Sequence, residues 1–457
     1  MSDRKSEQKQ RLDRISPSFC AAKWRQVTID LVHGTTHSCH HPKRHAVPLT
    51  ELRKNPAALH NTEFKKEQRR LMQDGRRPPE CSYCWDVEDL HKGISDRIHK
   101  SFSSWADPDL ENLAQLPWQQ DVAPFYLEVM LDNICNFSCV YCTADVSTGV
   151  AAELRRHGPY SFETQNSRSA EFADRSREKS LYAEAFQAWF PTIVKDLKIY
   201  RLTGGEPLLS AETWRSLDSL LELGHPQLTL SINSHFSHPH ALILRLADQV
   251  TGLLREKKIE KFELFVSLDT SGLAAEYIRQ GLQYGKVLEN LRKFSSLVPS
   301  AQIVIMCTFG ILSFGGFESF LADLVELKKS MPLKLDVSIL KNPDYLSAAF
   351  ATPDLVDQLR TSLSFMRQDR QAFADYEIEK VETLLTWICA QEGRSDIGRL
   401  RVTFYKFIHE FARRQGRKFD QAHPEYAGLL RACKSSCLDL LTPPPLDSAS
   451  GVGSAAD

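Results

Sequence analysis

From about residue 125, short apolar runs alternate regularly with longer amphipathic stretches, and this alternation constrains the fold more than any other feature of the chain. Repeated β-then-α units predict a parallel sheet covered by helices. The expected strands are Phe125–Leu131, Leu197–Leu202, Leu228–Ile232, Phe262–Leu268, Gln302–Thr308 and Leu333–Ile339. Six units are too few for a closed eight-stranded barrel. We therefore expect an α/β fold, a partial TIM-like (β/α)6 barrel with functional residues at the C-terminal ends of its strands.

The regions on either side of this alternation have a different composition. Residues 1–115 are rich in cysteine and histidine, and apart from local helices they look loop-like, with little core of their own. We expect the barrel at 120–345 with a polar insertion at 146–179, and a helical region at 346–440. The stretch 441–457 is rich in Pro, Ser, Ala and Gly, which predicts a disordered tail.

Composition excludes several classes of protein. No apolar run approaches the roughly 20 residues that span a bilayer, and residues 1–7 show no apolar h-region of a secretory signal. The 57 Lys and Arg nearly balance the 58 Asp and Glu, so no global field attracts nucleic acid or membrane. We expect a cytoplasmic protein. In that compartment thiols stay reduced, so the 11 cysteines indicate metal binding or catalysis rather than disulfides.

The most specific motif is a C-x3-C-x2-C run formed by Cys135, Cys139 and Cys142, directly after the first expected strand. Three thiolates this close on a loop can hold three corners of a [4Fe–4S] cluster. The fourth iron would then lack a protein ligand and could bind a substrate or cofactor. A structural zinc site normally has four protein ligands, and no fourth Cys or His follows closely.

A second motif, Gly204-Gly205-Glu206-Pro207, follows the second expected strand. Glycines let a ligand approach the backbone closely, and Glu206 offers a carboxylate for an ammonium group. Alone, this tetrapeptide could be an ordinary strand-to-helix turn. Next to the cysteine run, at the same edge of a parallel sheet, it predicts a binding site.

Together the two motifs resemble those of the radical S-adenosylmethionine (SAM) superfamily. In that family three cysteines hold a [4Fe–4S] cluster, and its open iron chelates the amino and carboxylate groups of SAM. The resemblance implies that Tyr141 packs near the adenine and that residues 204–207 bind the methionine ammonium. It also implies that Asn233 and Ser267 meet the ribose or carboxylate of SAM, and that Arg279 meets the carboxylate.

Four N-terminal cysteines, Cys20, Cys39, Cys81 and Cys84, resemble the cysteine-rich segment of twitch-type radical SAM proteins. In those proteins such a segment holds one auxiliary [4Fe–4S] cluster. The resemblance continues through residues 342–347 and so covers nearly the whole chain. One departure is the pair Cys39-His40, where many relatives of this type have adjacent cysteines.

Zinc is the alternative for the N-terminal segment. Cys39 is surrounded by five histidines: His33, His37, His40, His41 and His45. Residues 1–100 hold 20 Lys and Arg against 13 Asp and Glu, a net charge of +7. The second hypothesis is therefore a zinc or iron–sulfur protein that binds nucleic acid or modifies RNA. Against it, basic and acidic residues mix between Lys65 and Arg70, as on a solvated helix face.

The resemblance implies a radical SAM oxidoreductase or modifying enzyme. An electron donor such as flavodoxin or ferredoxin would drive cleavage of SAM to a 5′-deoxyadenosyl radical, which abstracts hydrogen from a substrate. If all four N-terminal cysteines bind one cluster, no iron is left for the substrate, and that cluster would accept an electron in a net oxidation. The residues do not select between a peptide and a small metabolite as substrate.

The remaining cysteines carry weaker signals. Cys307 and Cys389 lie singly in apolar runs, and free cysteines of this kind usually pack in a core. Cys433 and Cys437 form a pair near the C-terminal tail without evident partners, and we assign them no site.

Overall fold

The computed structural model describes residues 2–90, 95–162 and 176–439, so the expected tail at 441–457 lies outside the described residues. Its centre is one nine-stranded sheet with the strand order β11-β10-β8-β7-β6-β4-β1-β2-β3. The sheet strands are β1 (Gln26–Asp30), β2 (Thr35–His37), β3 (His45–Ala46), β4 (Tyr126–Met130), β6 (Ile199–Thr203), β7 (Thr229–Ser234), β8 (Lys261–Ser267), β10 (Gln302–Phe309) and β11 (Leu333–Ile339). A separate two-stranded ladder joins β5 (Ser138–Cys139) to β9 (Arg279–Gln280).

The six strands expected from the sequence are all present and lie side by side in chain order. Each pairs with the next in parallel. The prediction of a mixed α/β fold with a large, mostly parallel sheet is therefore confirmed. The sheet is open, with β11 at one edge and β3 at the other.

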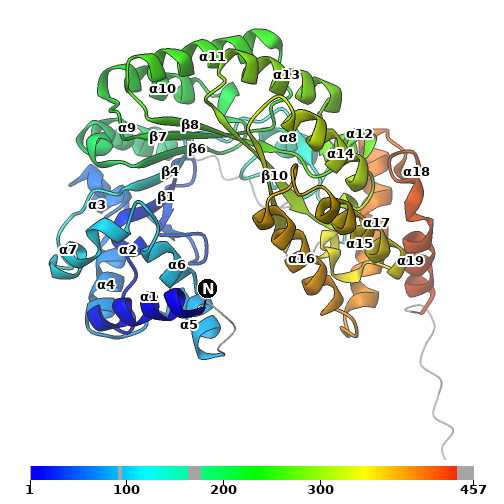
Figure 1. Ribbon diagram of the computed structural model, residues 1–457, viewed down its shortest axis with the longest axis horizontal. Coiled ribbons are helices and arrows are strands. Elements are labelled where there is room, and N and C mark those ends of the chain that lie inside the picture. The colour runs from blue at the N-terminus through cyan, green and yellow to red at the C-terminus, as the bar shows by residue number, and fades with distance from the viewer. Residues whose placement is uncertain (1, 91–94, 163–175, 440–457) are drawn as a thin grey trace, which may run out of the picture.

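Helices cover the outer face of the sheet and extend beyond both of its edges (Figure 1). The N-terminal helices are α1 (Ser2–Ile15), α2 (Ala22–Arg25), α3 (Leu49–Leu52), α4 (Glu63–Gln73), α5 (Ser82–Asp89), α6 (Asp96–Ser101) and α7 (Leu110–Gln115). The central helices are α8 (Thr148–His157), α9 (Ser176–Ile193), α10 (Ala211–Leu223), α11 (His240–Arg255), α12 (Gly272–Ile278), α13 (Tyr284–Leu297) and α14 (Phe317–Lys328). The C-terminal helices are α15 (Pro353–Gln368), α16 (Asp375–Cys389), α17 (Ile397–Gln415), α18 (Phe419–Ala422) and α19 (Ala427–Asp439).

The two faces of the sheet differ in character because side chains alternate along each strand. On the outer face, Val129, Leu202, Ile232 and Leu264 are fully buried beneath the helices. The inner face bears half-buried and often polar side chains. In Figure 1 this inner face is flanked by the N-terminal elements at one end and by α15, α16 and α17 at the other. The inner face is therefore the part of the sheet that can receive a ligand.

The N-terminal region is more ordered than the sequence suggested. Strand β1 pairs in parallel with β4, and β2 and β3 extend the same sheet antiparallel. The expectation of little core was wrong, because Phe19, Trp24, Met72 and Ile98 are buried in a second hydrophobic cluster separate from the main core. The missed signal was Gln26–Asp30, where the apolar residues alternate as in a half-buried strand.

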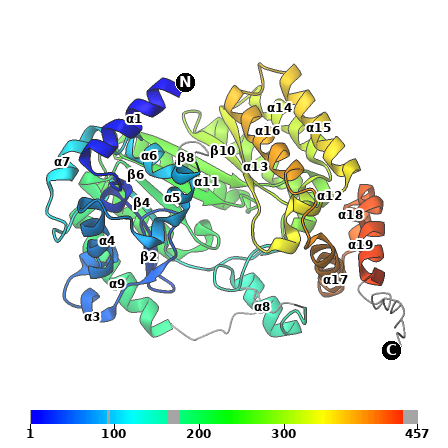
Figure 2. The ribbon, with the colours of Figure 1, turned by 90° about the horizontal axis from the view of Figure 1, so that it is seen from below.

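The polar insertion expected at 146–179 is described in part. The start of the insertion forms α8, which lies away from the N-terminal elements in Figure 2. Residues 163–175 lie outside the described residues.

Cys307 is buried as expected, but Cys389 is exposed because the last turn of α16 faces solvent at that position. Among the described residues, no helix combines the length and apolarity needed to cross a membrane.

Candidate functional site

The C-x3-C-x2-C loop and the Gly-Gly-Glu-Pro loop are in direct backbone contact at the C-terminal ends of β4 and β6. The amide of Gly205 donates to the carbonyl of Asp132 at 3.2 Å, and the amide of Glu206 donates to the carbonyl of Ile134 at 2.7 Å. A Cβ at Gly205 would lie 2.4 Å from the carbonyl oxygen of Ile134, which no side chain tolerates. Glycine is therefore required for the two loops to pack together.

The N-terminus of α8 fixes the cysteine loop from the other side. Thr148 Oγ1 accepts a hydrogen bond from the amide of Cys135 at 3.0 Å and donates to the carbonyl of the same residue at 2.9 Å. Ser147 Oγ donates to the carbonyl of Phe137 at 2.7 Å and also caps α8. The amide of Phe137 donates to Cys135 Sγ at 3.4 Å. The beginning of the polar insertion thus holds the loop, which the sequence did not reveal.

The ladder between β5 and β9 places Arg279 opposite Cys139. Arg279 is buried and makes two hydrogen bonds to Asp269, from Nε at 2.9 Å and from Nη2 at 3.1 Å. The hydroxyl of Tyr141 donates to the same carboxylate at 2.7 Å. Tyr141 and Arg279, both singled out in the sequence, therefore share Asp269 as a partner beside the cysteine loop.

Glu206 is almost completely buried, and several groups surround its carboxylate. Oε1 accepts from Ser234 Oγ at 2.8 Å, and Oε2 accepts from the amide of His235 at 2.8 Å. The imidazoles of His235 and His238 lie 3.4 Å and 3.1 Å from the carboxylate oxygens. Burial opposes ionisation of Glu206, but these neighbours outweigh it and lower the pKa to about 2. The carboxylate therefore carries a full negative charge at neutral pH.

That charge lacks a permanent counter-cation. Among the described residues, no Lys or Arg lies within ion-pair distance of Glu206. Burial lowers the pKa of His235 to about 4, so this imidazole is neutral at pH 7. Its Nδ1 accepts from the amide of Ser237, and Nε2 lies 2.9 Å from Asn136 Oδ1. A buried carboxylate next to a neutral imidazole attracts a cation strongly, because little solvent screens it.

A sharp turn carries the two histidines into this position. Phe236 lies between them with φ of 56°, a left-handed conformation that is strained for a bulky residue. Asn290 stabilises the turn by donating to the carbonyls of Phe236 and His238 at 2.9 Å and 3.0 Å. Neither histidine was predicted from the sequence. The available signal was the His-x-x-His spacing directly after a strand.

Asn233 and Ser267 lie on the inner face of the sheet, at the ends of β7 and β8. Asn233 Oδ1 accepts from Arg201 Nε at 2.9 Å, and its Nδ2 lies 3.5 Å from Met306 Sδ. Ser267 is paired with Met306 in the register between β8 and β10. Both residues therefore belong to the same half-buried surface, close to the ends of the strands that precede the cysteine and glycine loops.

The four N-terminal cysteines converge on one small cavity, although up to 64 residues separate them in the sequence. Cys20, Cys39, Cys81 and Cys84 all line it, and none forms a disulfide. We call these residues the four-cysteine group. Burial raises the pKa of Cys20, Cys39 and Cys84, while the nearby backbones of Ala22, His41 and Arg97 act in the opposite direction. Backbone amides of this kind stabilise the negative sulfur of thiolates that bind metal.

Buried cations accompany the four-cysteine group. Lys23 and Arg97 are both almost fully buried and line the same cavity. Burial alone would lower the pKa of Lys23, but the nearby Cys81 and the Glu80 carboxylate raise it above its usual value, so Lys23 stays charged. Arg97 is paired with Glu88 at 2.8 Å. Positive charge beside the thiols favours their deprotonation, which metal binding requires.

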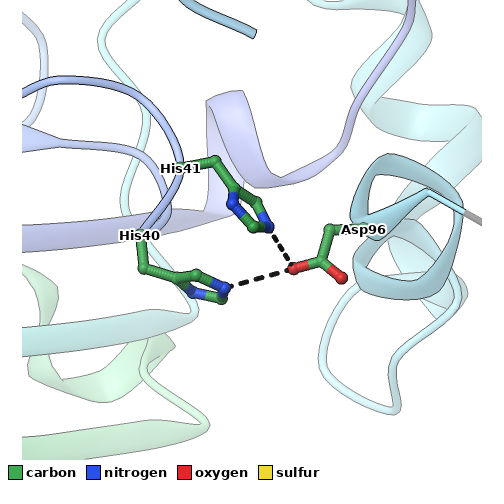
Figure 3. A group of neighbouring side chains, drawn as sticks. All are labelled: His40, His41 and Asp96. Atoms are coloured by element: carbon green, nitrogen blue, oxygen red, sulfur yellow. Dashed lines mark hydrogen bonds and ion pairs between the residues drawn. The ribbon is translucent and has the colours of Figure 1, made fainter. Parts of the chain in front are cut away.

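Histidines near Cys39 have partners other than its sulfur. His40 and His41 both point at one oxygen of Asp96, at 3.3 Å and 2.8 Å (Figure 3). His33 bonds to Asp30, His37 to the carbonyl of Cys39, and His45 to Thr62. The ring of His41 also stacks on Tyr83, with centroids 3.7 Å apart. His40 and His41 thereby tie the loop that carries Cys39 to the start of α6.

Comparisons with known proteins give little overall similarity. No protein-family model matches this chain, and no curated protein matches it in sequence. Crystal structures of Streptococcus suis SuiB are similar to it at low level. With precursor peptide SuiA bound, the TM-score is 0.34 at 12% identity, covering 77% of this chain and 70% of that one. With S-adenosylmethionine bound, the TM-score is 0.32 at 11% identity, covering 76% and 67%.

Proposed function

We propose that this protein is a radical SAM enzyme, in which Cys135, Cys139 and Cys142 hold a [4Fe–4S] cluster with one open iron. The observation that carries the proposal is the packing of the cysteine loop on Gly204 and Gly205, with the buried charge of Glu206 directly beside them. The same proposal assigns the parallel strands to a partial (β/α)6 barrel. With SAM bound, such a cluster supplies a 5′-deoxyadenosyl radical that abstracts hydrogen from a substrate.

Each neighbouring residue then has a distinct role in binding SAM. Glu206 holds the methionine ammonium, since no Lys or Arg of the described residues lies within ion-pair distance of its carboxylate. Tyr141 lies beside the adenine, and Arg279 is oriented by Asp269 toward the carboxylate. Asn233 and Ser267 contact the ribose or carboxylate from the inner face. The buried positions of Glu206 and Arg279 exclude water from these contacts.

For the four-cysteine group we propose an auxiliary [4Fe–4S] cluster rather than zinc. Four thiolates around one tetrahedral zinc ion at about 2.3 Å would lie about 3.8 Å apart. In the described residues, the groups of three or more ligand atoms within 4.8 Å of one another are His40–His41–Asp96 and Glu206–His235–His238, and neither includes a cysteine. The wider spacing of the sulfurs favours the corners of a larger cluster. Its proposed role is to accept an electron in a net oxidation of the substrate.

Replacement of Cys139 by Ala tests the main proposal. The variant should lose one cluster and all reductive formation of 5′-deoxyadenosine, because two thiolates do not hold the cube. Cys389→Ala is a matched control, since Cys389 is exposed and belongs to neither cysteine group. Iron content and 5′-deoxyadenosine are measured after anaerobic reconstitution with a chemical reductant. Retained SAM cleavage in a folded Cys139→Ala protein would refute the assignment.

A further inference from the structure

A cavity of about 540 Å³ lies between the N-terminal region and the inner face of the sheet. We call it the chamber. The side chains that bear on its chemistry are Arg44, Lys100, Trp105, Tyr126, Glu128 and Arg201. Its volume falls within the range of roughly 300–1,000 Å³ that is typical of sites for small ligands.

The chamber lies between the two sets of cysteines. Pro42 and Lys100 line both the chamber and the cavity of the four-cysteine group, so the two spaces share a wall. On the side of the chamber that the sheet forms, Arg201 of β6 donates to Asn233 Oδ1 at 2.9 Å. A ligand in the chamber would therefore contact the wall of the four-cysteine group and also Arg201, which is bonded to Asn233 of the proposed SAM surface.

Positive charge dominates the chamber. Three cationic side chains, Arg44, Lys100 and Arg201, line it against the single carboxylate of Glu128 among its lining residues. Histidines at positions 37, 40 and 99 line it as well. The chain as a whole has a net charge of −1, so this excess is a local property of the chamber. A confined cationic space raises the local concentration of anions.

The cations differ in how far other groups already neutralise them. Within residues 2–90, 95–162 and 176–439, no carboxylate lies at ion-pair distance from Lys100, although Asp96 acts on it at longer range. Arg201 lies 3.9 Å from Glu128 and stacks over the ring of Phe265 at 4.0 Å. Arg44 is paired with Asp30 at 3.1 Å. Lys100 and Arg201, on opposite walls, therefore have the most capacity to bind an anion.

The remaining wall is aromatic. The rings of Trp105 and Tyr126 lie 6.0 Å apart and are tilted by 51°. Burial raises the pKa of Tyr126 to about 12, so its hydroxyl remains a neutral hydrogen-bond donor at pH 7. Tyr126 donates to Glu128 at 3.3 Å, so a neighbour on the same strand already engages the one carboxylate that lines the chamber.

We propose that the chamber binds the substrate of this enzyme through an oxyanion, either a carboxylate or a phosphate, held between Lys100 and Arg201. This inference rests on the function proposed above, because only that function makes the chamber the place where a substrate meets SAM. A neutral ligand would leave the half-buried Lys100 ammonium without a counter-charge, which is unfavourable.

Binding of simple probes tests the proposal without knowledge of the substrate. Calorimetric titrations at fixed ionic strength would use glutarate, inorganic phosphate and glutaramide, which is the neutral amide of nearly the same shape as glutarate. At least one anion should bind the reconstituted enzyme and glutaramide should not. Lys100→Gln and Arg201→Gln should each weaken anion binding about tenfold, as expected for loss of one charge-assisted hydrogen bond. Lys100→Arg should retain binding within about threefold.

Controls separate this inference from the proposed function. Lys54→Gln removes an exposed cation of the same region outside the chamber and should leave anion binding unchanged. Tighter binding of glutarate indicates a carboxylate substrate, and tighter binding of phosphate indicates a phosphorylated one. Equal binding of glutaramide, no binding of either anion, or unchanged affinity in both Gln variants would overturn the chamber proposal. Iron content and SAM cleavage of the same preparations report independently on the proposed function.

Discussion

Replacement of Glu206 by Gln tests the electrostatics of the proposed SAM site most directly. The change keeps the size of the side chain and removes only its charge. An ammonium bound to Glu206 forms a charge-assisted hydrogen bond in a site shielded from water, since Glu206 is 1% exposed. Hydrogen bonds to charged groups contribute about 1.5–3 kcal/mol, so we expect SAM to bind about 10- to 150-fold more weakly.

The structure also predicts a cost in stability for the same substitution. Ser234 Oγ and the amide of His235 donate to different oxygens of Glu206. A glutamine amide has only one oxygen, so its NH2 group must face one of these donors. An unpaired buried donor costs about 1–3 kcal/mol, and the free energy of unfolding should fall by that amount. Anaerobic equilibrium dialysis measures SAM affinity, and urea denaturation measures stability.

Two comparisons make this experiment decisive. 5′-Methylthioadenosine lacks the methionine ammonium, so its affinity should be the same in the wild type and in Glu206→Gln. Glu212→Gln changes a carboxylate on α10 that pairs with Arg215 and lies outside the site, so it should bind SAM normally. An unchanged SAM affinity in folded, iron-loaded Glu206→Gln would refute the assignment of Glu206. An equal loss of affinity for both ligands would show that the variant disturbs the site in general.

Four further changes test other parts of the structure. Cys84→Ala should lower the iron content while SAM cleavage continues, because the four-cysteine group is separate from the cysteine loop; loss of cleavage would contradict this separation. Gly205→Ala should destabilise the protein by about 2 kcal/mol or more in urea denaturation, because its Cβ would meet the carbonyl of Ile134 at 2.4 Å. Gly252→Ala in α11, where a Cβ meets nothing within 4 Å, should instead stabilise it by about 0.5–1 kcal/mol. Burial lowers the pKa of His423 to about 3, so the native state resists its protonation and stability is lost as the pH falls from 6.5 toward 3. His423→Leu should remove about 2 kcal/mol of the stability lost between pH 7 and pH 5, as measured by denaturation at both values.

The sequence predicted best those parts of the fold that local patterns determine. The strands β4, β6, β7, β8, β10 and β11 were found because each is an apolar run next to an amphipathic helix. Strand β1 was missed because its partner, β4, lies 100 residues further along the chain. Alternation within five residues is a weak signal without knowledge of that partner.

The candidate site shows the same division between local and distant information. The spacing of the three cysteines predicts one loop of the site. The two glycines predict a second loop that approaches a backbone closely, and the structure places these two loops in contact. The partners of Glu206 could not, because His235 and His238 reach it through a strained turn at Phe236. The lowered pKa of His235 depends on burial, which spacing alone does not determine.

The parallel pairing of β1 with β4 also determines which fragments of this protein can exist in isolation. All five residues of β1 are in register with β4, from Gln26 opposite Tyr126 to Asp30 opposite Met130. A shortened chain that begins after Ala46 would leave the N–H and C=O groups of β4 unpaired along an open edge. Unprotected edges of this kind recruit strands from other molecules and lead to aggregation. The cysteine loop would then follow directly after this exposed edge strand. We therefore expect the part of the protein that contains the parallel strands to be obtained in folded form only when the residues up to β1 are included.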